Sequence, residues 1–96
     1  MSPKNKKKLE SIRIKLDNLD NKLLALIKYL TSLVKEVLKL KEFKKEIVDQ
    51  KRINFILNKI KGKSKKLKID PKITNRIWKN MIWSYIDYER RNFKKK

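Results

Sequence analysis

The stretch that decides the fold is LESIRIKLDNLDNKLLALIKYLTSLVKEVLKL, residues 9–40. Its apolar residues recur at alternating steps of three and four, which is the heptad pattern of a long helix that packs lengthwise on other helices. These residues are Leu9, Ile12, Leu16, Leu19, Leu23, Leu26, Leu30, Leu33, Val37 and Leu40. Because no Gly or Pro lies between Pro3 and Gly62, the pattern predicts one helix over residues 6–43, roughly 57 Å long.

Such a helix is too long for one small chain to bury. A globule of 96 residues has a radius of gyration of only about 13 Å. The apolar stripe of a rod this long therefore needs the surface of another chain, and we expect a homodimer. Any active site is then expected to draw residues from both chains.

Two shorter helices are expected after the long one, so the predicted fold class is all-α with three helices per chain. Residues 44–48 read as a loop, and Asp49 is a good N-cap for a second helix that ends near Gly62. Asp70 followed by Pro71 is a strong start signal for a third helix that runs to about Phe93. We expect a single domain over residues 1–96, with disordered basic tails at 1–7 and 94–96.

The formal net charge of +19 suggests an anionic partner. Most of the 29 basic residues are Lys, however, and they are spread along the whole chain, whereas readers of nucleic acid rely on clustered Arg. Nucleic-acid binding is therefore the less favoured interpretation. A cationic surface that attracts small dianions is favoured instead.

The composition also narrows the chemistry. The chain has no Cys and no His, which removes disulfides, thiolate metal sites and the commonest general base, and its single Gly excludes a glycine-rich phosphate loop. We therefore expect no metal and no cofactor. No secretory signal and no apolar run of membrane-spanning length is evident, so the sequence predicts a cytoplasmic protein without a membrane partner.

Arg13 and Lys41 each lie one step past a residue of the apolar stripe. They are roughly 42 Å apart along a straight helix, so one chain cannot close both on one small ligand. In an antiparallel dimer, Arg13 of one chain could approach Lys41 of the other. The alternative is that both side chains extend over the stripe into solvent.

Two further positions stand out. Arg52 lies in the first turn of the second helix, where it could hold an anion or form a surface pair with Asp49. Glu89 lies on the apolar stripe of the third helix, where desolvation disfavours a charged carboxyl. It could donate a hydrogen bond when protonated, or form a salt bridge with Arg13 or Lys41 that has no catalytic role.

Five segments in order resemble the all-helical chorismate mutases, and especially the branch that includes the isochorismate pyruvate lyases. They are LDNLDNKLLALI (16–27), LVKEVLKLK (33–41), IVDQKRINFIL (47–57), IDPKI (69–73) and IWKNMIWSYIDYE (77–89). The resemblance covers nearly the whole chain, from about Leu9 to Phe93. It implies an intertwined homodimer of three-helix chains with two equivalent active sites.

The resemblance also implies roles for individual residues. It places a cationic binding residue of the neighbouring chain at Arg13, and the central lysine that holds a substrate carboxylate and the ether oxygen at Lys41. It places a pocket acid at Asp49 and an adjoining carboxylate-binding arginine at Arg52. The residue that hydrogen-bonds the breaking ether oxygen falls at Glu89, which must be protonated to donate, so activity is expected to favour mildly acidic pH.

Three positions depart from the family pattern. Leu30 stands where an arginine usually binds a carboxylate, Ile53 where a glutamate usually contacts the substrate hydroxyl, and Tyr85 where a small hydroxyl residue is common. The changes at Ile53 and Tyr85 resemble the lyase branch. Loss of the arginine at Leu30 removes a charge-assisted contact worth roughly 1.5–3 kcal/mol.

The function implied is a chorismate mutase of aromatic amino acid biosynthesis, acting on a small dicarboxylate without a cofactor. A pericyclic rearrangement needs a shaped, cationic cage and no nucleophile, which suits a chain without His or Cys. Isochorismate pyruvate lyase activity is the alternative in the same pocket. A non-catalytic helical dimer and a basic nucleic-acid-binding protein are alternatives of other classes.

Overall fold

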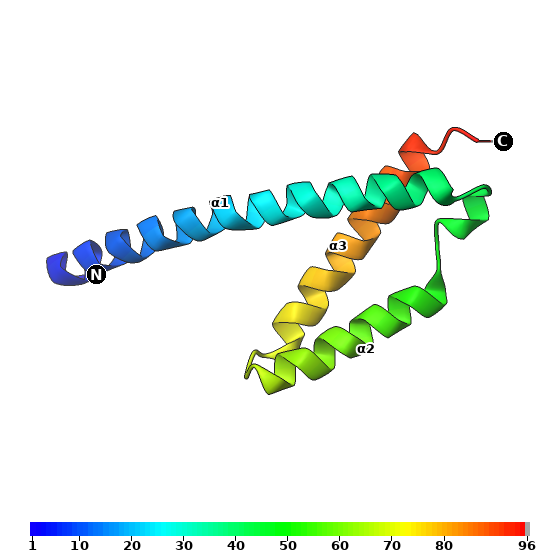
Figure 1. The fold of residues 1–96 in the computed structure, drawn as a ribbon. Helices are drawn as coiled ribbons and strands as arrows, with labels where there is room; N and C mark the ends of the chain where they lie inside the picture. The colour runs from blue at the N-terminus through cyan, green and yellow to red at the C-terminus, as the bar shows by residue number, and fades with distance from the viewer. Residues whose placement is uncertain (96) are drawn as a thin grey trace. The chain divides into compact units, whose positions relative to one another are not determined.

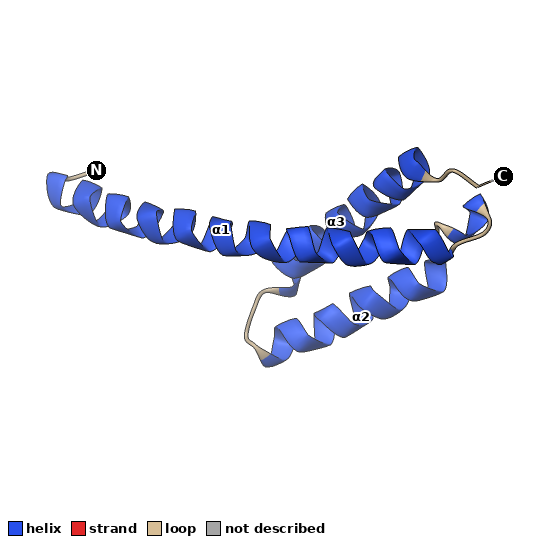
Figure 2. Cartoon of the chain, turned by 45° about the horizontal axis from the view of Figure 1, so that its top comes forward, coloured by secondary structure: helices blue, strands red, loops and turns tan. Residues whose placement is uncertain are grey.

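The computed structural model describes residues 1–95, and these form three α-helices and one short 3-10 helix. The order is α1 (Pro3–Leu40), η1 (Lys44–Glu46), α2 (Gln50–Lys66) and α3 (Pro71–Asn92) (Figure 1). No strand occurs among the described residues, as the colouring of Figure 2 shows. The predicted all-α class with three helices, one of them very long, is confirmed.

The long helix begins and ends three residues earlier than the sequence pattern predicted. The Ser2 hydroxyl accepts a hydrogen bond from the Asn5 amide at 3.2 Å, and Pro3 occupies the first helical position. This is an N-cap followed by the residue best suited to the first turn. Residues 3–7, which we expected to be part of a disordered tail, therefore form the first turns of α1, because Lys is a good helix former and the start is capped.

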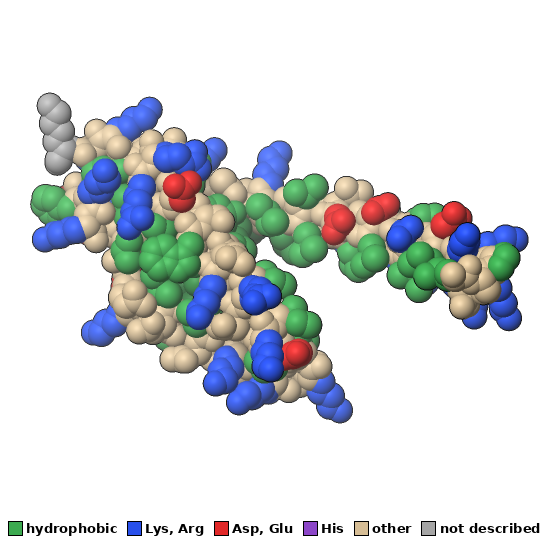
Figure 3. All heavy atoms as spheres, turned by 180° about the vertical axis from the view of Figure 1, so that it is seen from behind, with side chains coloured by type: hydrophobic (Ala, Val, Ile, Leu, Met, Phe, Trp, Pro, Cys, Tyr) green, Lys and Arg blue, Asp and Glu red, His purple; other side chains and the backbone are tan. Residues whose placement is uncertain are grey.

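The chain divides into two compact units, Met1–Leu33 and the part from Val34 onward. In the first unit the apolar stripe of α1 is exposed to solvent. The stripe residues at least half exposed there are Ile12, Leu16, Leu19, Leu23 and Leu26, and Figure 3 shows hydrophobic side chains on the surface of this helix. One chain therefore does not bury the stripe, as its length predicted, and the homodimer remains a prediction.

In the second unit α2 and α3 pack against each other as a helical hairpin. The core consists of Ile47, Ile53 and Ile86, each less than a tenth exposed. Val48, Leu57, Ile82 and Phe93 pack around this core. The starts of both helices agree with the sequence signals, because Asp49 accepts from the Arg52 amide at 3.0 Å and Asp70 from the Lys72 amide at 2.9 Å.

The end of α2 differs from the prediction. The helix continues through Gly62 and ends at Lys66, where three Lys residues in the last turn favour the negative end of the helix dipole. The left-handed residue that terminates it is Lys68, with φ of 59°, and the Ile69 amide donates to the Ser64 carbonyl at 2.9 Å. Ser64 is buried and shares a 2.6 Å hydrogen bond with the Thr74 hydroxyl of α3. This contact favours an α2 that extends past the glycine.

Candidate functional site

The most distinctive polar contact in the second unit joins Lys41 to Glu89. The Lys41 Nζ donates to Glu89 Oε2 at 2.6 Å, and the two side chains are only 16% and 9% exposed. An ion pair that is largely shielded from water is uncommon, because removing both charged groups from water costs free energy that the pairing must offset. The contact joins the end of α1 to the last turns of α3.

The local sequence explains how Glu89 reaches this position. Ile82, Ile86, Glu89 and Phe93 follow one another at steps of four, three and four on one face of α3. Ile86 is part of the core, so the next position on that face, one turn further on, is also buried. The burial expected for Glu89 from the apolar stripe is therefore present in the structure.

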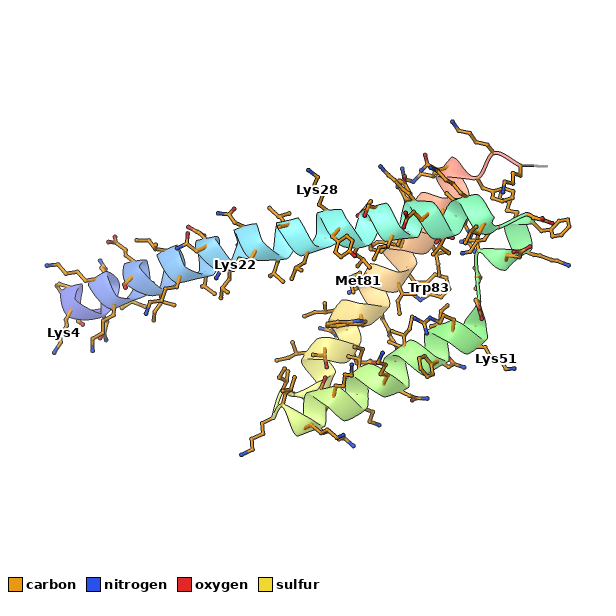
Figure 4. The ribbon with its side chains drawn as sticks, viewed as in Figure 1. Lys4, Lys22, Lys28, Lys51, Met81 and Trp83 are labelled. Atoms are coloured by element: carbon orange, nitrogen blue, oxygen red, sulfur yellow. The ribbon has the colours of Figure 1, made fainter. Side chains whose placement is uncertain are left out.

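Lys41 follows the last residue of α1, and its amide donates to the Leu38 carbonyl at 3.2 Å. Its partly buried side chain contrasts with those of Lys4, Lys22, Lys28 and Lys51, which are exposed and project away from their helices (Figure 4). Of the two partners that the sequence left open for Glu89, the structure shows Lys41.

The start of α2 holds two more of the predicted site residues. The Asp49 carboxylate caps the helix through the Arg52 amide. The Arg52 guanidinium is exposed and lies over the ring of Phe55, 5.2 Å from its centroid. Both residues have local contacts within α2, and the described contacts do not connect them to Lys41 or Glu89.

The positions that depart from the family pattern have different environments. Ile53 is 7% exposed and contributes to the core, so its side chain is used for packing. Tyr85 is half-buried on α3, one turn before Glu89. Leu30 and Arg13 lie in the other unit, Met1–Leu33, where Leu30 is half-buried and Arg13 is exposed.

Sequence reasoning missed one residue near Lys41. We expected Lys95 to belong to a disordered tail, yet its Nζ donates to the main-chain carbonyls of Lys39 and Lys41 at 2.6 and 2.9 Å. No local signal could have indicated this, because the partners are more than fifty residues apart in the sequence. Lys96 lies outside the described residues.

Chemically, the site offers an ammonium group and a carboxyl group that are both shielded from water. Such groups can stabilise charge or share a proton with a bound molecule. Among residues 1–95 no group of three or more acidic, His or Cys side chains could hold a metal ion. Within the same residues no helix is long and apolar enough to cross a membrane.

The model of the chorismate mutase type II family matches residues 12–90, most of the chain. The chain belongs to the chorismate mutase type II family. No curated protein and no solved structure matches it significantly.

Membership of the chorismate mutase type II family agrees with the all-helical fold and indicates a chorismate mutase-type function. The matched range contains all the site residues named above from Arg13 to Glu89, and it ends before Lys95. A role for Lys95 therefore has to be argued from the structure of this chain.

Proposed function

We propose that this protein converts chorismate to prephenate in a cationic pocket centred on Lys41 and Glu89, in aromatic amino acid biosynthesis. The observation that carries the proposal is the shielded 2.6 Å contact between these two side chains, in a chain of the chorismate mutase type II family. The rearrangement breaks a carbon–oxygen bond and forms a carbon–carbon bond within one molecule. The protein has to hold the compact conformer and stabilise developing charge.

In this proposal Lys41 supplies the transition-state stabilisation. Its ammonium group donates to the ether oxygen, on which negative charge grows as the bond breaks. Because water is largely excluded, a charge-assisted hydrogen bond to that oxygen is stronger than it would be in solution. The ether oxygen then replaces Glu89 Oε2 as an acceptor of the Lys41 ammonium.

Glu89 has two states in this proposal. Without substrate, its carboxylate accepts from Lys41. An ionised carboxylate beside a dianionic substrate is repelled by it, so the productive complex has Glu89 protonated and donating to the ether oxygen.

A second copy of the chain completes the pocket in this proposal. Arg13 of the second chain and Arg52 of the first anchor the two carboxylates, with Asp49 and Tyr85 at the pocket wall. Support comes from the exposed stripe of α1, because monomeric proteins rarely expose contiguous apolar surface of that extent. Alignment of two such helices would bury both stripes. In this proposal the enzyme acts in the cytoplasm.

The deciding experiment is to incubate the purified protein with chorismate and identify the product. Lys41→Ala should abolish turnover while the helical circular dichroism and the sedimentation of the protein stay unchanged. Lys39→Ala is the matched control, because it removes an exposed ammonium group two residues before Lys41, in the last turn of α1. Prephenate formation by Lys41→Ala at the wild-type rate would refute the mechanism.

Isochorismate pyruvate lyase activity in the same pocket is the second candidate. It is favoured by Ile53, which is buried in the core, and by Tyr85, since both positions resemble the lyase branch. Release of pyruvate from isochorismate, without prephenate from chorismate, would establish this activity in place of the mutase.

Two non-catalytic functions can be tested separately. If the missing arginine at Leu30 has inactivated the site, Leu30→Arg should increase substrate binding about ten- to a hundredfold, from the strength of one charge-assisted contact. If the protein binds nucleic acid, its retention on DNA or RNA should fall steeply with salt. Figure 3 shows Lys and Arg side chains spread over the visible face, without one dominant cluster.

A further inference from the structure

The ammonium group of Lys95 lies at the C-terminal end of α1. Its Nζ donates to the Lys39 carbonyl at 2.6 Å and to the Lys41 carbonyl at 2.9 Å. The last four carbonyls of any helix have no partner within the helix. The Lys41 amide satisfies the Leu38 carbonyl, and Lys95 satisfies the next one in the helix as well as the carbonyl of Lys41 itself.

Charge favours the same arrangement. The C-terminal end of a helix carries a partial negative charge, and α1 is 38 residues long with one Lys in its own last turn. An ammonium group that donates two hydrogen bonds to that end is stabilised by the helix dipole as well as by the bonds themselves. The contact thus has a physical basis beyond proximity.

The end of α1 borders open space on one side. Within the described residues, the extensive helix packing of the second unit is between α2 and α3. A cavity of about 360 Å³ lies between the last turns of α1 and the end of α3, lined by residues that include Leu38, Tyr88 and Phe93. The polar contacts across this gap are those of Lys41 with Glu89 and of Lys95 with the carbonyls of Lys39 and Lys41.

The residues after α3 are well placed to provide such a contact. Phe93 packs against the core of Ile47, Ile53 and Ile86, so the chain is anchored two residues before Lys95. The Asn92 side chain donates to the Tyr88 carbonyl at 2.8 Å and holds the last turn of α3. Lys41 therefore forms two hydrogen bonds with the C-terminal part of the chain. Its side chain donates to Glu89, and its carbonyl accepts from Lys95.

We propose that Lys95 is a positioning residue for Lys41, whose ammonium group fixes the main chain at the end of α1 and thereby sets the direction of the Lys41 side chain. The proposal rests on the function proposed above, in which Lys41 acts on the substrate. Lys95 does not touch the substrate. It acts through the backbone of Lys41, and its loss misaligns the reactive ammonium group, which enzymes tolerate poorly.

The test compares three variants of the full chain. Lys95→Met keeps the aliphatic stem and removes the charge, Lys95→Arg restores a cationic donor, and Lys94→Met is the control at the neighbouring exposed lysine. In Lys95→Met, amide hydrogen exchange over residues 38–46 should accelerate and the NMR signals of the Lys41 ammonium and the Glu89 carboxyl should shift. The kcat of Lys95→Met should fall roughly threefold to tenfold with little change in KM. The assay is run well below the melting temperature of the variant, so that unfolding does not cause the loss.

Lys94→Met should resemble the wild type in every readout, and Lys95→Arg should recover most of the lost kcat. An unchanged kcat in Lys95→Met would overturn the proposal even if exchange accelerated, because Lys95 would then only cap the helix. If the wild type forms no product from either substrate, the proposed function fails. In that case the NMR signals of the Lys41 ammonium and the Glu89 carboxyl in Lys95→Met decide whether Lys95 positions Lys41. Unchanged signals would overturn this role of Lys95.

Discussion

Glu89 is a carboxyl on a helix face that is otherwise apolar, and its described partner is the ammonium group of Lys41. Each of the two side chains makes the burial of the other tolerable, because removing one would leave an uncompensated charge in a shielded place. In the proposed reaction the ether oxygen of the substrate lies between Lys41 and Glu89, and Glu89 changes from hydrogen-bond acceptor to donor. The hydrogen bond that Glu89 gives to the ether oxygen is therefore expected to contribute to turnover.

Glu89→Gln tests that hydrogen bond. The Gln amide also donates, so Glu89→Gln should form prephenate at a rate within about tenfold of the wild type, whereas Glu89→Leu, which has no donor, should lose on the order of a hundredfold in kcat. Steady-state kinetics with chorismate measures both variants. Equal losses in the two variants would show that a donor at this position contributes nothing to turnover.

Lys68 is the second residue with a particular constraint. Its φ of 59° lies in the left-handed region, which costs a residue with a Cβ roughly 1–2 kcal/mol. Gly62, by contrast, lies in the interior of α2, where a glycine costs about 1 kcal/mol relative to Ala. A Cβ at Gly62 would meet no atom within 4 Å. The glycine of this helix is thus six residues away from the position that needs it.

For the helix α2 as an element, stability should increase if its glycine is moved from position 62 to position 68. Gly62→Ala and Lys68→Gly should each raise the free energy of unfolding by about 1 kcal/mol, and the double variant by about 2 kcal/mol. Urea denaturation followed by circular dichroism measures this. Lys66→Gly is the matched control, since it makes the same exchange at a helical residue and should destabilise the protein. Equal effects of Lys66→Gly and Lys68→Gly would contradict the argument.

The hydrogen bond between Ser64 and Thr74 joins α2 to α3 in the hairpin. Ser64→Ala removes a buried hydrogen bond and should lower the free energy of unfolding by about 1 kcal/mol. Ser84→Ala is the control, because Ser84 also bonds a carbonyl four residues earlier but is exposed. It should change stability little. Losses of the same size in both variants would show that the bond between the two helices contributes nothing.

At the scale of the whole molecule, the exposed stripe of α1 predicts self-association. Leu23→Lys introduces a charge in the middle of the stripe, and Asn21→Lys introduces the same charge on the opposite side of the helix. Because each chain would lose the burial of one Leu, Leu23→Lys should raise the dimer dissociation constant at least about a hundredfold. Asn21→Lys should leave it nearly unchanged.

Analytical ultracentrifugation over a range of concentrations measures the association. Activity should fall with dimer content in Leu23→Lys, because Arg13 of a second chain completes the proposed pocket. A wild-type protein that sediments as a monomer throughout, or a fully active monomeric variant, would remove the two-chain site from the proposal.

Local patterns were sufficient to determine much of this protein. The heptad stripe predicted the long helix, Asp49 and Asp70-Pro71 predicted the starts of α2 and α3, and the spacing of apolar residues on α3 predicted the burial of Glu89. Each of these depends on neighbours within one or two turns, so the sequence by itself contains the information. The ordered segments that resemble the chorismate mutase family were sufficient for the family as well.

Other features depend on residues that are distant in the sequence, and only the tertiary structure decided them. The end of α2 at Lys66 instead of Gly62 accompanies the contact of Ser64 with Thr74. The choice of Lys41 as the partner of Glu89 depends on where the chain brings the end of α1 close to α3. The contact of Lys95 with the end of α1 brings a residue of the supposed tail to the site. The physical reason is common to all three: a hydrogen bond between residues in separate segments has no periodicity along the chain, so no local pattern predicts it.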